Sequence, residues 1–152
     1  MVTVRVYGIL LLNNEVLVSD EHIRGSYYTK FPGGGLEAGE GTRDCLQREF
    51  MEEMNLRVSI GDHIYTTDFY QLSAFNPADQ ILAIYYYATA LEPITVPLRS
   101  RPFHFDAEQE KTYAAVQQAE TFRFIAHADF SPESVTLPID KIVAGMVMNT
   151  RK

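Results

Sequence analysis

Three glutamates stand close together in the first half of the chain and give the strongest indication of chemistry. Glu49, Glu52 and Glu53 belong to residues 48–56, which read Arg-Glu-Phe-Met-Glu-Glu-Met-Asn-Leu. At about 100° per residue in a helix, the three side chains fall within one arc of roughly 100°. Carboxylates that share a helix face repel one another unless a cation lies between them. The spacing therefore predicts a site for a hard divalent ion.

The donors around these glutamates indicate which ion would bind. The histidines and the single cysteine of the chain show no zinc-type spacing, so an oxygen-only ligand set would favour Mg²⁺ or Mn²⁺. Residues 33–35 are three glycines, which let the backbone come close to an ion, so that a main-chain carbonyl could join the ligands. Arg48 could orient Glu49 or Glu52, or pair with Glu40 across a turn.

A helix over residues 42–54 would hold the glutamates in place. The turn Gly39-Glu40-Gly41 precedes it, and Thr42 is its expected N-cap. Apolar residues spaced by four form a stripe beside the acidic face and would anchor the helix on a core. This stripe consists of Leu46, Phe50 and Met54.

Residues 34–56 resemble the Nudix box, the signature of hydrolases that act on a nucleoside diphosphate linked to another group. Their order is G-x5-E-x7-R-E-U-x-E-E-x-N-U, in which U is apolar. The one departure is Asn55, where the pattern of the family has glycine. The helix should end there in a left-handed residue, and asparagine is the next best residue after glycine for that conformation. We therefore expect a small loss of stability and intact chemistry.

The resemblance implies attack of water, assisted by a metal ion, on a phosphorus of a diphosphate bridge. The matching positions imply roles for six residues, as metal ligands, base or supporting groups. The resemblance gives metal ligation or base catalysis to Glu49, Glu52 and Glu53. It gives metal ligation through its carbonyl to Gly33, and support of these groups to Arg48 and Glu40. Which glutamate acts as the base stays open. In the family the base can also come from outside the box, and the candidates here are Glu108, Glu110 and Glu120, each expected to be an exposed charge.

Length and composition fit one domain over residues 1–152, with 46% hydrophobic residues to form a core. We expect no signal peptide and no membrane span, because the longest early apolar run is Ile9 to Leu12. A lone cysteine, Cys45, suits a reducing cytoplasm. The net charge of −7 argues against binding of nucleic acid polymers and favours a small-molecule nucleotide substrate.

The rest of the chain alternates between strand and helix patterns. Alternating valines and the turn Asn13-Asn14 predict a hairpin near the N-terminus, and a second hairpin should join residues 56–75 and 80–91. Further along, the patterns predict helices over 107–119 and 137–148 and a strand over 121–126. Periodicity alone gives an α/β or α+β fold. The resemblance implies a Nudix-like α/β/α sandwich with a mixed β-sheet.

Residues 21–30 are predicted to form a loop that runs into Phe31 and overhangs the metal site. Tyr28 and Phe31 could stack on a base, and Arg24 could meet a phosphate. The alternative is that the aromatic rings fill a strand face and that the basic group is solvated. The box does not specify what is attached to the diphosphate, so a nucleoside triphosphate, an ADP-sugar and a dinucleotide all fit.

Two other functions are consistent with parts of the sequence. A Nudix-like module could sense a nucleotide without cleaving it, although such modules often lose box acids and this chain keeps all of them. An isomerase of isoprenoid diphosphates has a similar fold, but it relies on a catalytic cysteine away from this helix, whereas Cys45 lies inside the box. We interpret Cys45 as structural. A homodimer is possible, as in many relatives.

Overall fold

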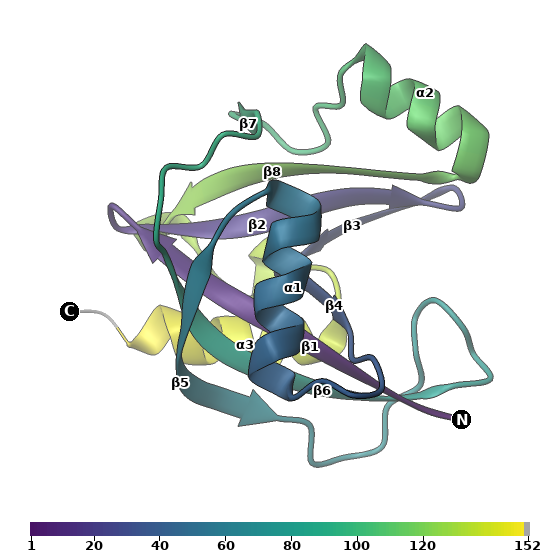
Figure 1. Ribbon diagram of the computed structural model, residues 1–152, viewed down its shortest axis with the longest axis vertical. Helices are drawn as coiled ribbons and strands as arrows, with labels where there is room; N and C mark the ends of the chain where they lie inside the picture. The colour runs from purple at the N-terminus through teal and green to yellow at the C-terminus, as the bar shows by residue number, and fades with distance from the viewer. Residues whose placement is uncertain (151–152) are drawn as a thin grey trace. The chain divides into compact units, whose positions relative to one another are not determined.

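The computed structural model describes residues 1–150 and divides the chain into two compact units, each built from two segments. The first unit contains Met1–Leu11 and Pro32–Thr95, and the second contains Leu12–Phe31 and Val96–Lys152. Each unit has β-strands and at least one helix (Figure 1).

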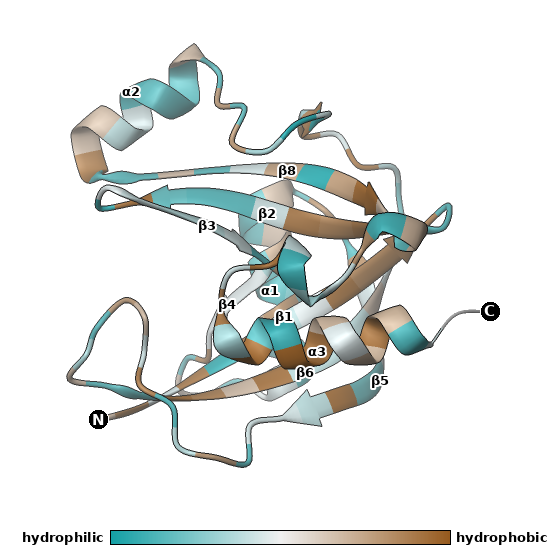
Figure 2. Cartoon of the chain, turned by 180° about the vertical axis from the view of Figure 1, so that it is seen from behind, coloured by the Kyte–Doolittle hydropathy of each residue, from teal (hydrophilic) through white to brown (hydrophobic). Residues whose placement is uncertain are grey.

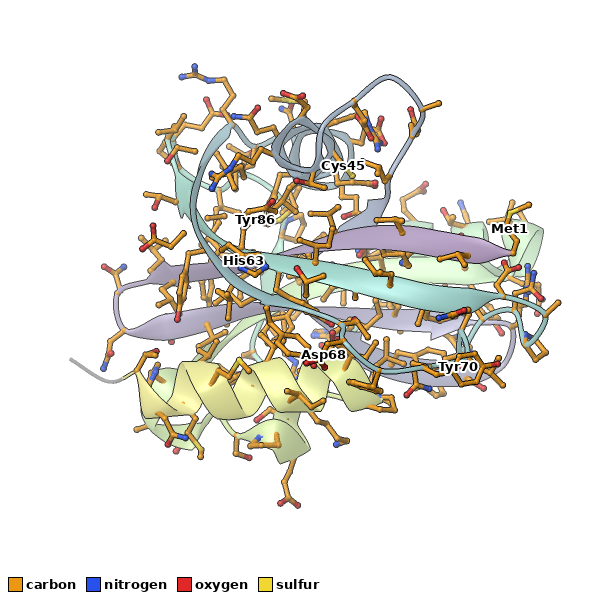
Figure 3. All side chains as sticks on the ribbon, turned by 90° about the horizontal axis from the view of Figure 1, so that it is seen from below. Met1, Cys45, His63, Asp68, Tyr70 and Tyr86 are labelled. Atoms are coloured by element: carbon orange, nitrogen blue, oxygen red, sulfur yellow. The ribbon has the colours of Figure 1, made fainter. Side chains whose placement is uncertain are left out.

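The first unit holds one helix and four strands. These are β1 (Val2–Leu12), β4 (Gly33–Gly35), α1 (Thr42–Met54), β5 (Val58–Thr66) and β6 (Gln80–Ala90). Strand β1 pairs antiparallel with β4 and parallel with β6, and β6 pairs antiparallel with β5. Helix α1 covers one face of this sheet (Figures 1 and 3). The predicted hairpin of β5 and β6 is confirmed, but β5 ends at Thr66, so the expectation of a strand reaching residue 75 is wrong.

Helix α1 packs on the sheet through the predicted apolar stripe. Leu46, Phe50 and Met54 are all buried, with at most 1% of each side chain exposed. The opposing strand allows this close approach, because a Cβ added to Gly8 would lie only 2.7 Å from Cε2 of Phe50. The acidic face is thereby fixed at the border of the core.

The start of α1 differs from the prediction. Its N-cap is Gly41, whose N–H donates to Oδ2 of Asp44 at 3.1 Å. Thr42, the predicted N-cap, is instead the first helical residue. Its hydroxyl lies 2.7 Å from the hydroxyl of Tyr86 on β6, so a tertiary contact takes the group that local sequence reasoning assigned to the cap.

The end of α1 is as predicted. Asn55 is left-handed, with φ 50° and ψ 42°, and its N–H donates to the carbonyl of Met51 at 3.0 Å. The N–H of Leu56 also donates to the carbonyl of Phe50, at 3.4 Å, so two carbonyls at the end of the helix are satisfied around the left-handed residue.

Replacing Asn55 with glycine is therefore expected to raise the free energy of unfolding by a few tenths of a kcal/mol, up to about 1 kcal/mol, because glycine adopts positive φ without steric strain. Thermal unfolding of Asn55→Gly beside Asn55→Ala measures this. Alanine should lower the melting temperature, and a large loss with glycine would contradict the left-handed cap.

The second unit holds four strands, two helices and two short 3₁₀ turns. These are β2 (Glu15–Ile23), β3 (Ser26–Lys30), β7 (Leu98–Arg99), α2 (Ala107–Val116), β8 (Gln118–Ala126), η1 (His127–Asp129), η2 (Pro132–Ser134) and α3 (Pro138–Asn149). Strand β2 pairs antiparallel with β3 and β8, and β7 is parallel to β8. The terminal helix is confirmed, and helix α2 stops at Val116, three residues before the predicted end.

Residues 21–30 do not form the predicted loop. They belong to the hairpin of β2 and β3, whose turn is made by Arg24 at φ 47° and Gly25 at φ 86°. The turn predicted at Asn13-Asn14 is present, since both residues are left-handed, at φ 51° and 62°. Two adjacent left-handed residues are typical of tight hairpin turns, and sequence reasoning recognised only the asparagine pair.

Both sheets combine parallel and antiparallel pairs, and hydrophobic residues run along their strands (Figure 2). With three helices, this fits the mixed-sheet α/β sandwich that the resemblance implies. Within residues 1–150, no helix is long and apolar enough to cross a lipid bilayer.

Candidate active site

The glycine strand β4 brings the backbone against both β1 and α1. Gly33 has φ +151°, and a Cβ added to it would overlap the carbonyl oxygen of Val6. A Cβ added to Gly34 would overlap the carboxylate of Glu49. The missing side chain at Gly34 therefore creates the space in which this carboxylate lies.

Arg48 connects the glycine strand to the acidic residues. Its Nε and Nη2 donate to the two oxygens of Glu40 at 3.0 and 2.7 Å, and Nη2 also donates to the carbonyl of Gly35 at 3.0 Å. Its Nη1 lies 3.2 Å from Glu52 and 3.5 Å from Glu49. Hydrogen bonding by Arg48 lowers the pKa of Glu40 to about 2 and in turn raises the pKa of Arg48. The guanidinium therefore remains a fixed positive charge within the box.

The three glutamates on α1 differ in their exposure. The side chain of Glu49 is 12% exposed, whereas that of Glu52 is 57% exposed. Glu53 is half-buried, and its Oε1 is shielded from water. Burial raises the pKa of Glu49, although the positive charge of Arg48 opposes this effect. A carboxylate held in this environment gains most from a nearby cation.

The oxygen atoms of the three glutamates suit a hard divalent ion by their chemistry. In the observed side-chain conformations, no three acidic, histidine or cysteine residues within 1–150 are close enough together to hold a metal ion. Glu49, Glu52 and Glu53 nevertheless lie within one turn of α1, and rotation about their side-chain torsions can bring their oxygens together. All these donors are oxygens, and the space beside Gly34 already admits one carboxylate. Such a set suits Mg²⁺ or Mn²⁺ better than zinc.

Cys45 is buried on the side of α1 that faces the sheet (Figure 3). Its Sγ lies 3.5 Å from the carbonyl oxygen of Gly35 and 4.0 Å from that of Gly34. Burial raises the pKa of this thiol to about 12. A protonated, buried thiol is a poor nucleophile, which agrees with its interpretation as a structural residue.

The three residues predicted to touch the substrate all belong to the second unit. Arg24 is exposed at the hairpin turn, and its backbone N–H donates to Gln117 at 2.9 Å. Tyr28 is half-buried in β3. Phe31 is fully buried, with its ring centroid 5.9 Å from that of Phe130. Stacking of Phe31 on a base would require this ring to leave its place.

A buried polar cluster in the second unit was not foreseen. Ser19 donates to Glu120 at 2.5 Å and lies 3.2 Å from Glu21, and Lys30 lies 2.8 Å from Glu21. The side chains of Lys30 and Glu21 are only 4% and 14% exposed. The expectation that Glu120 is an exposed charge is therefore wrong, whereas the two candidate acids on α2 are exposed. Glu120 on β8 lies directly opposite Glu21 on β2. This pairing could have been predicted only if the register of the two strands had been known.

This cluster predicts a dependence of stability on pH. Burial raises the pKa of Glu120 from 4.5 to about 7, and the charge of Glu21 adds to this. Between these values the folded state binds more protons than the unfolded state, so the free energy of unfolding falls as pH rises. Glu120→Gln removes this penalty and should stabilise the protein by roughly 1–3 kcal/mol at pH 8 but little at pH 5. Ser19 and Lys30, which also face Glu120, are unchanged in this variant.

Chemical unfolding at the two pH values measures the difference, with exposed Glu133→Gln as the control. The charge and hydrogen bond of Lys30 outweigh burial and lower the pKa of Glu21. The stability that this group contributes is present above its ordinary pKa of 4.5 and is lost only as pH falls below that value, so it differs little between pH 5 and pH 8. An equal change of stability at pH 5 and pH 8 would contradict the shared burial of the two carboxylates.

Arg5 on β1 is a second residue that sequence reasoning missed. It lies opposite Gly35 in the register of β1 and β4, and its Nε donates to the hydroxyl of Tyr7 at 2.7 Å. The signal in the sequence was a single arginine among alternating valines, in a strand that carries no other charge.

A glycine strand set against a helix that carries three glutamates and an arginine, in an α/β sandwich, is typical of a hydrolase acting on diphosphates. The chain belongs to the Nudix family, because the model of the NUDIX domain matches residues 2–134, which include segments of both units. The family confirms the prediction of a Nudix-type pyrophosphohydrolase. A comparison with curated proteins gave no match.

Solved structures with the same fold include several Nudix proteins. A MutT protein from Bacillus halodurans has a TM-score of 0.67 at 16% identity, over 97% of this chain and 83% of that one. A NUDIX hydrolase from Nitrosomonas europaea has a TM-score of 0.65 at 18% identity, over 98% and 71%. An ADP-ribose pyrophosphatase from Streptococcus suis has a TM-score of 0.59 at 12% identity, over 99% and 94%. At these identities the likeness shows the fold alone.

Proposed function

We propose that the chain is a metal-dependent hydrolase that cleaves the diphosphate bond of a nucleoside diphosphate linked to another moiety. The observation that carries this proposal is the carboxylate of Glu49 seated against Gly34, beside Glu52 and Glu53 on the same helix face. The substrate class includes nucleoside triphosphates, ADP-sugars and dinucleotides. The name of the ADP-ribose pyrophosphatase neighbour supports the ADP-sugar within this range.

The residues of the box and Gly33, which precedes it, would have different roles in hydrolysis. Glu49, Glu52, Glu53 and the carbonyl of Gly33 would hold Mg²⁺ or Mn²⁺. When bound, such an ion neutralises phosphate oxygens and lowers the pKa of a water molecule. Arg48 and Glu40 orient the glutamates through the hydrogen bonds described above.

The reaction itself is a displacement at phosphorus. A glutamate carboxylate accepts a proton from the attacking water. The water oxygen then forms a bond to phosphorus as the bridging P–O bond breaks, and the bridging oxygen leaves with the second phosphate. Two phosphate-bearing products result. The identity of the general base stays open among the glutamates.

The experiment is a panel of nucleoside triphosphates, ADP-ribose, sugar nucleotides and dinucleoside polyphosphates, each with Mg²⁺, with Mn²⁺ and with EDTA. Release of phosphate or nucleotide from one class, abolished by EDTA, is the expected result. A chain that cleaves nothing, yet gains melting temperature with a nucleotide, would be a sensing module instead.

Four further expectations stay predictions. Arg24 and Tyr28 contact the substrate, a homodimer is possible, the chain works in the cytoplasm, and it does not bind nucleic acid polymers. The effect of Arg24→Ala on KM tests the contact with the substrate, and mass measurement in solution tests the homodimer.

A further inference from the structure

A stack of three parallel rings joins helix α2 to the hairpin of β2 and β3. The imidazole of His22 lies between the rings of Tyr27 on β3 and Tyr113 on α2, with centroid distances of 4.1 and 3.7 Å and interplanar angles of 4° and 5°. His22 and Tyr27 are paired in the strand register, and Phe103 meets the ring of Tyr27 edge-on at 5.1 Å. The hairpin therefore covers one face of the imidazole, whereas α2 covers the other.

Helix α2 is held by this stack and by polar contacts. It has ten residues, none of them buried, and it lies at the end of the second unit where β2 turns into β3 (Figure 1). Isolated helices of this length are marginal in water, so α2 depends on its contacts with the strands. One of these is the ion pair of Arg99 with Asp106, and partly exposed pairs contribute little. The ring that α2 supplies is therefore the part of the stack that can leave at the lowest cost.

The hairpin turn also gives two hydrogen bonds to α2. Its residues Arg24 and Gly25 are both left-handed. The N–H of Gly25 donates to the hydroxyl of Tyr113 at 2.8 Å. The N–H of Arg24 donates to the carbonyl of Gln117, the C-cap of α2, at 2.9 Å. Successive N–H groups in a turn form a cradle for acceptor oxygens, and α2 supplies both oxygens here.

The stack and the turn together suit a planar ring that carries acceptor atoms. Tyr113 presents these features, because its ring stacks on His22 while its hydroxyl oxygen accepts from the turn. A nucleobase presents them as well, since it has a π-face for stacking and oxygen or nitrogen acceptors at its edge. The exposed side chain of Arg24 adds a positive charge at the same turn, which favours a base that is attached to phosphate.

We propose that the tip of the β2–β3 hairpin is a nucleobase-binding site, and that Tyr113 of α2 occupies it until a base displaces the ring. Helix α2 is then a lid that carries its own competitor, and its docking lowers the apparent affinity for the base. The choice of a nucleobase rests on the proposed function, although binding at this site requires no cleavage. The base can belong to the substrate or to a second nucleotide, and the experiment below distinguishes these sources.

The test measures the binding of nucleosides to the whole chain in EDTA. Adenosine, guanosine, cytidine and uridine are titrated separately, and hydrogen exchange of the α2 amides is followed at each concentration. The expected result is saturable binding of at least one nucleoside together with faster exchange in α2, because the base takes the place of Tyr113. A wild type that binds no nucleoside, or that binds one while exchange in α2 stays the same, would overturn the inference.

Variants identify the residues that form the site. Tyr113→Ala removes the competitor and should tighten nucleoside binding roughly 5- to 150-fold, the range for one stacked pair and one hydrogen bond. Tyr113→Phe keeps the stack and frees only the N–H of Gly25, so it should tighten binding less. His22→Ala should weaken binding by a similar factor, because it removes the ring on which the base stacks. Tyr70→Ala is the control, since it removes a tyrosine that is 68% exposed in the first unit, and the affinity should change by less than about twofold.

The outcomes separate this inference from the proposed function. If the panel shows cleavage but Tyr113→Ala binds nucleosides no better than the wild type, only the inference fails. If nucleosides bind and displace α2 while no substrate is cleaved, only the proposed function fails. Competition between the bound nucleoside and the cleaved substrate would assign the site to the base of the substrate, and binding without competition would assign it to a second nucleotide. If His22→Ala does not fold, His22→Leu keeps apolar bulk at this position and removes the π-face, and the same readouts apply.

Discussion

Turnover by the Glu53→Gln variant is expected to fall by about two to four powers of ten, while the variant folds as the wild type does. Glutamine keeps the length and helix propensity of glutamate, so α1 should not change. It removes the negative charge that would stabilise a divalent ion, and its amide accepts a proton poorly. Because Glu53 is half-buried with Oε1 shielded from water, solvent would compensate for this charge only in part.

The measurement is kcat on the substrate that the panel identifies, at several concentrations of Mg²⁺ and Mn²⁺. Glu133→Gln is the matched control, because it makes the same change at an exposed position in the second unit. Turnover near the wild-type value would remove Glu53 from the mechanism. A loss of several degrees in melting temperature would instead assign Glu53 to the fold.

The box helix could be predicted from the sequence because its signals are local. The apolar stripe and the left-handed Asn55 act within a few residues of one another, and the bounds 42–54 are those observed. The N-cap was wrong because Tyr86, 44 residues away, takes the hydroxyl of Thr42. Contacts between distant strands and helices are not visible in a local pattern.

The environments of individual side chains were harder to predict than the elements that carry them. Glu120 belongs to a predicted strand, yet its burial depends on Glu21 and Ser19 across the register of β2 and β8. Phe31 lies beside the predicted glycine turn, yet its ring is buried against Phe130. The acidic residues of the box could be recognised from their spacing in the sequence. The position of Arg5 beside the glycine strand could not, because it depends on the pairing of β1 with β4 and β6.

The second large effect is expected from a single methyl group. Gly34→Ala should lower kcat/KM by about a hundredfold or more, because the new Cβ would overlap the carboxylate of Glu49 and displace it. A displacement of roughly 1 Å in a positioned group can cost a factor of about 10². Gly34 has no left-handed backbone, so the substitution adds no strain of that kind. The fold should survive, since Glu49 can turn away toward solvent.

Gly61→Ala on β5 is the control for this substitution. Its added Cβ would lie 3.5 Å from the carbonyl oxygen of Tyr87, an ordinary contact, and we expect wild-type activity. Comparable losses of activity in Gly34→Ala and Gly61→Ala would show that any methyl group on the sheet disturbs the enzyme, and would contradict a specific role for the space at Gly34.

A double-mutant cycle then identifies the group that the methyl displaces. If Gly34→Ala acts through Glu49, the change Glu49→Gln should lower activity strongly in the wild type but only slightly in the Gly34→Ala background. If the two substitutions act independently, their effects on the activation free energy add. Additive effects would show that Gly34→Ala does not act through Glu49. Non-additive effects would support Gly34 as the residue that positions Glu49 for catalysis.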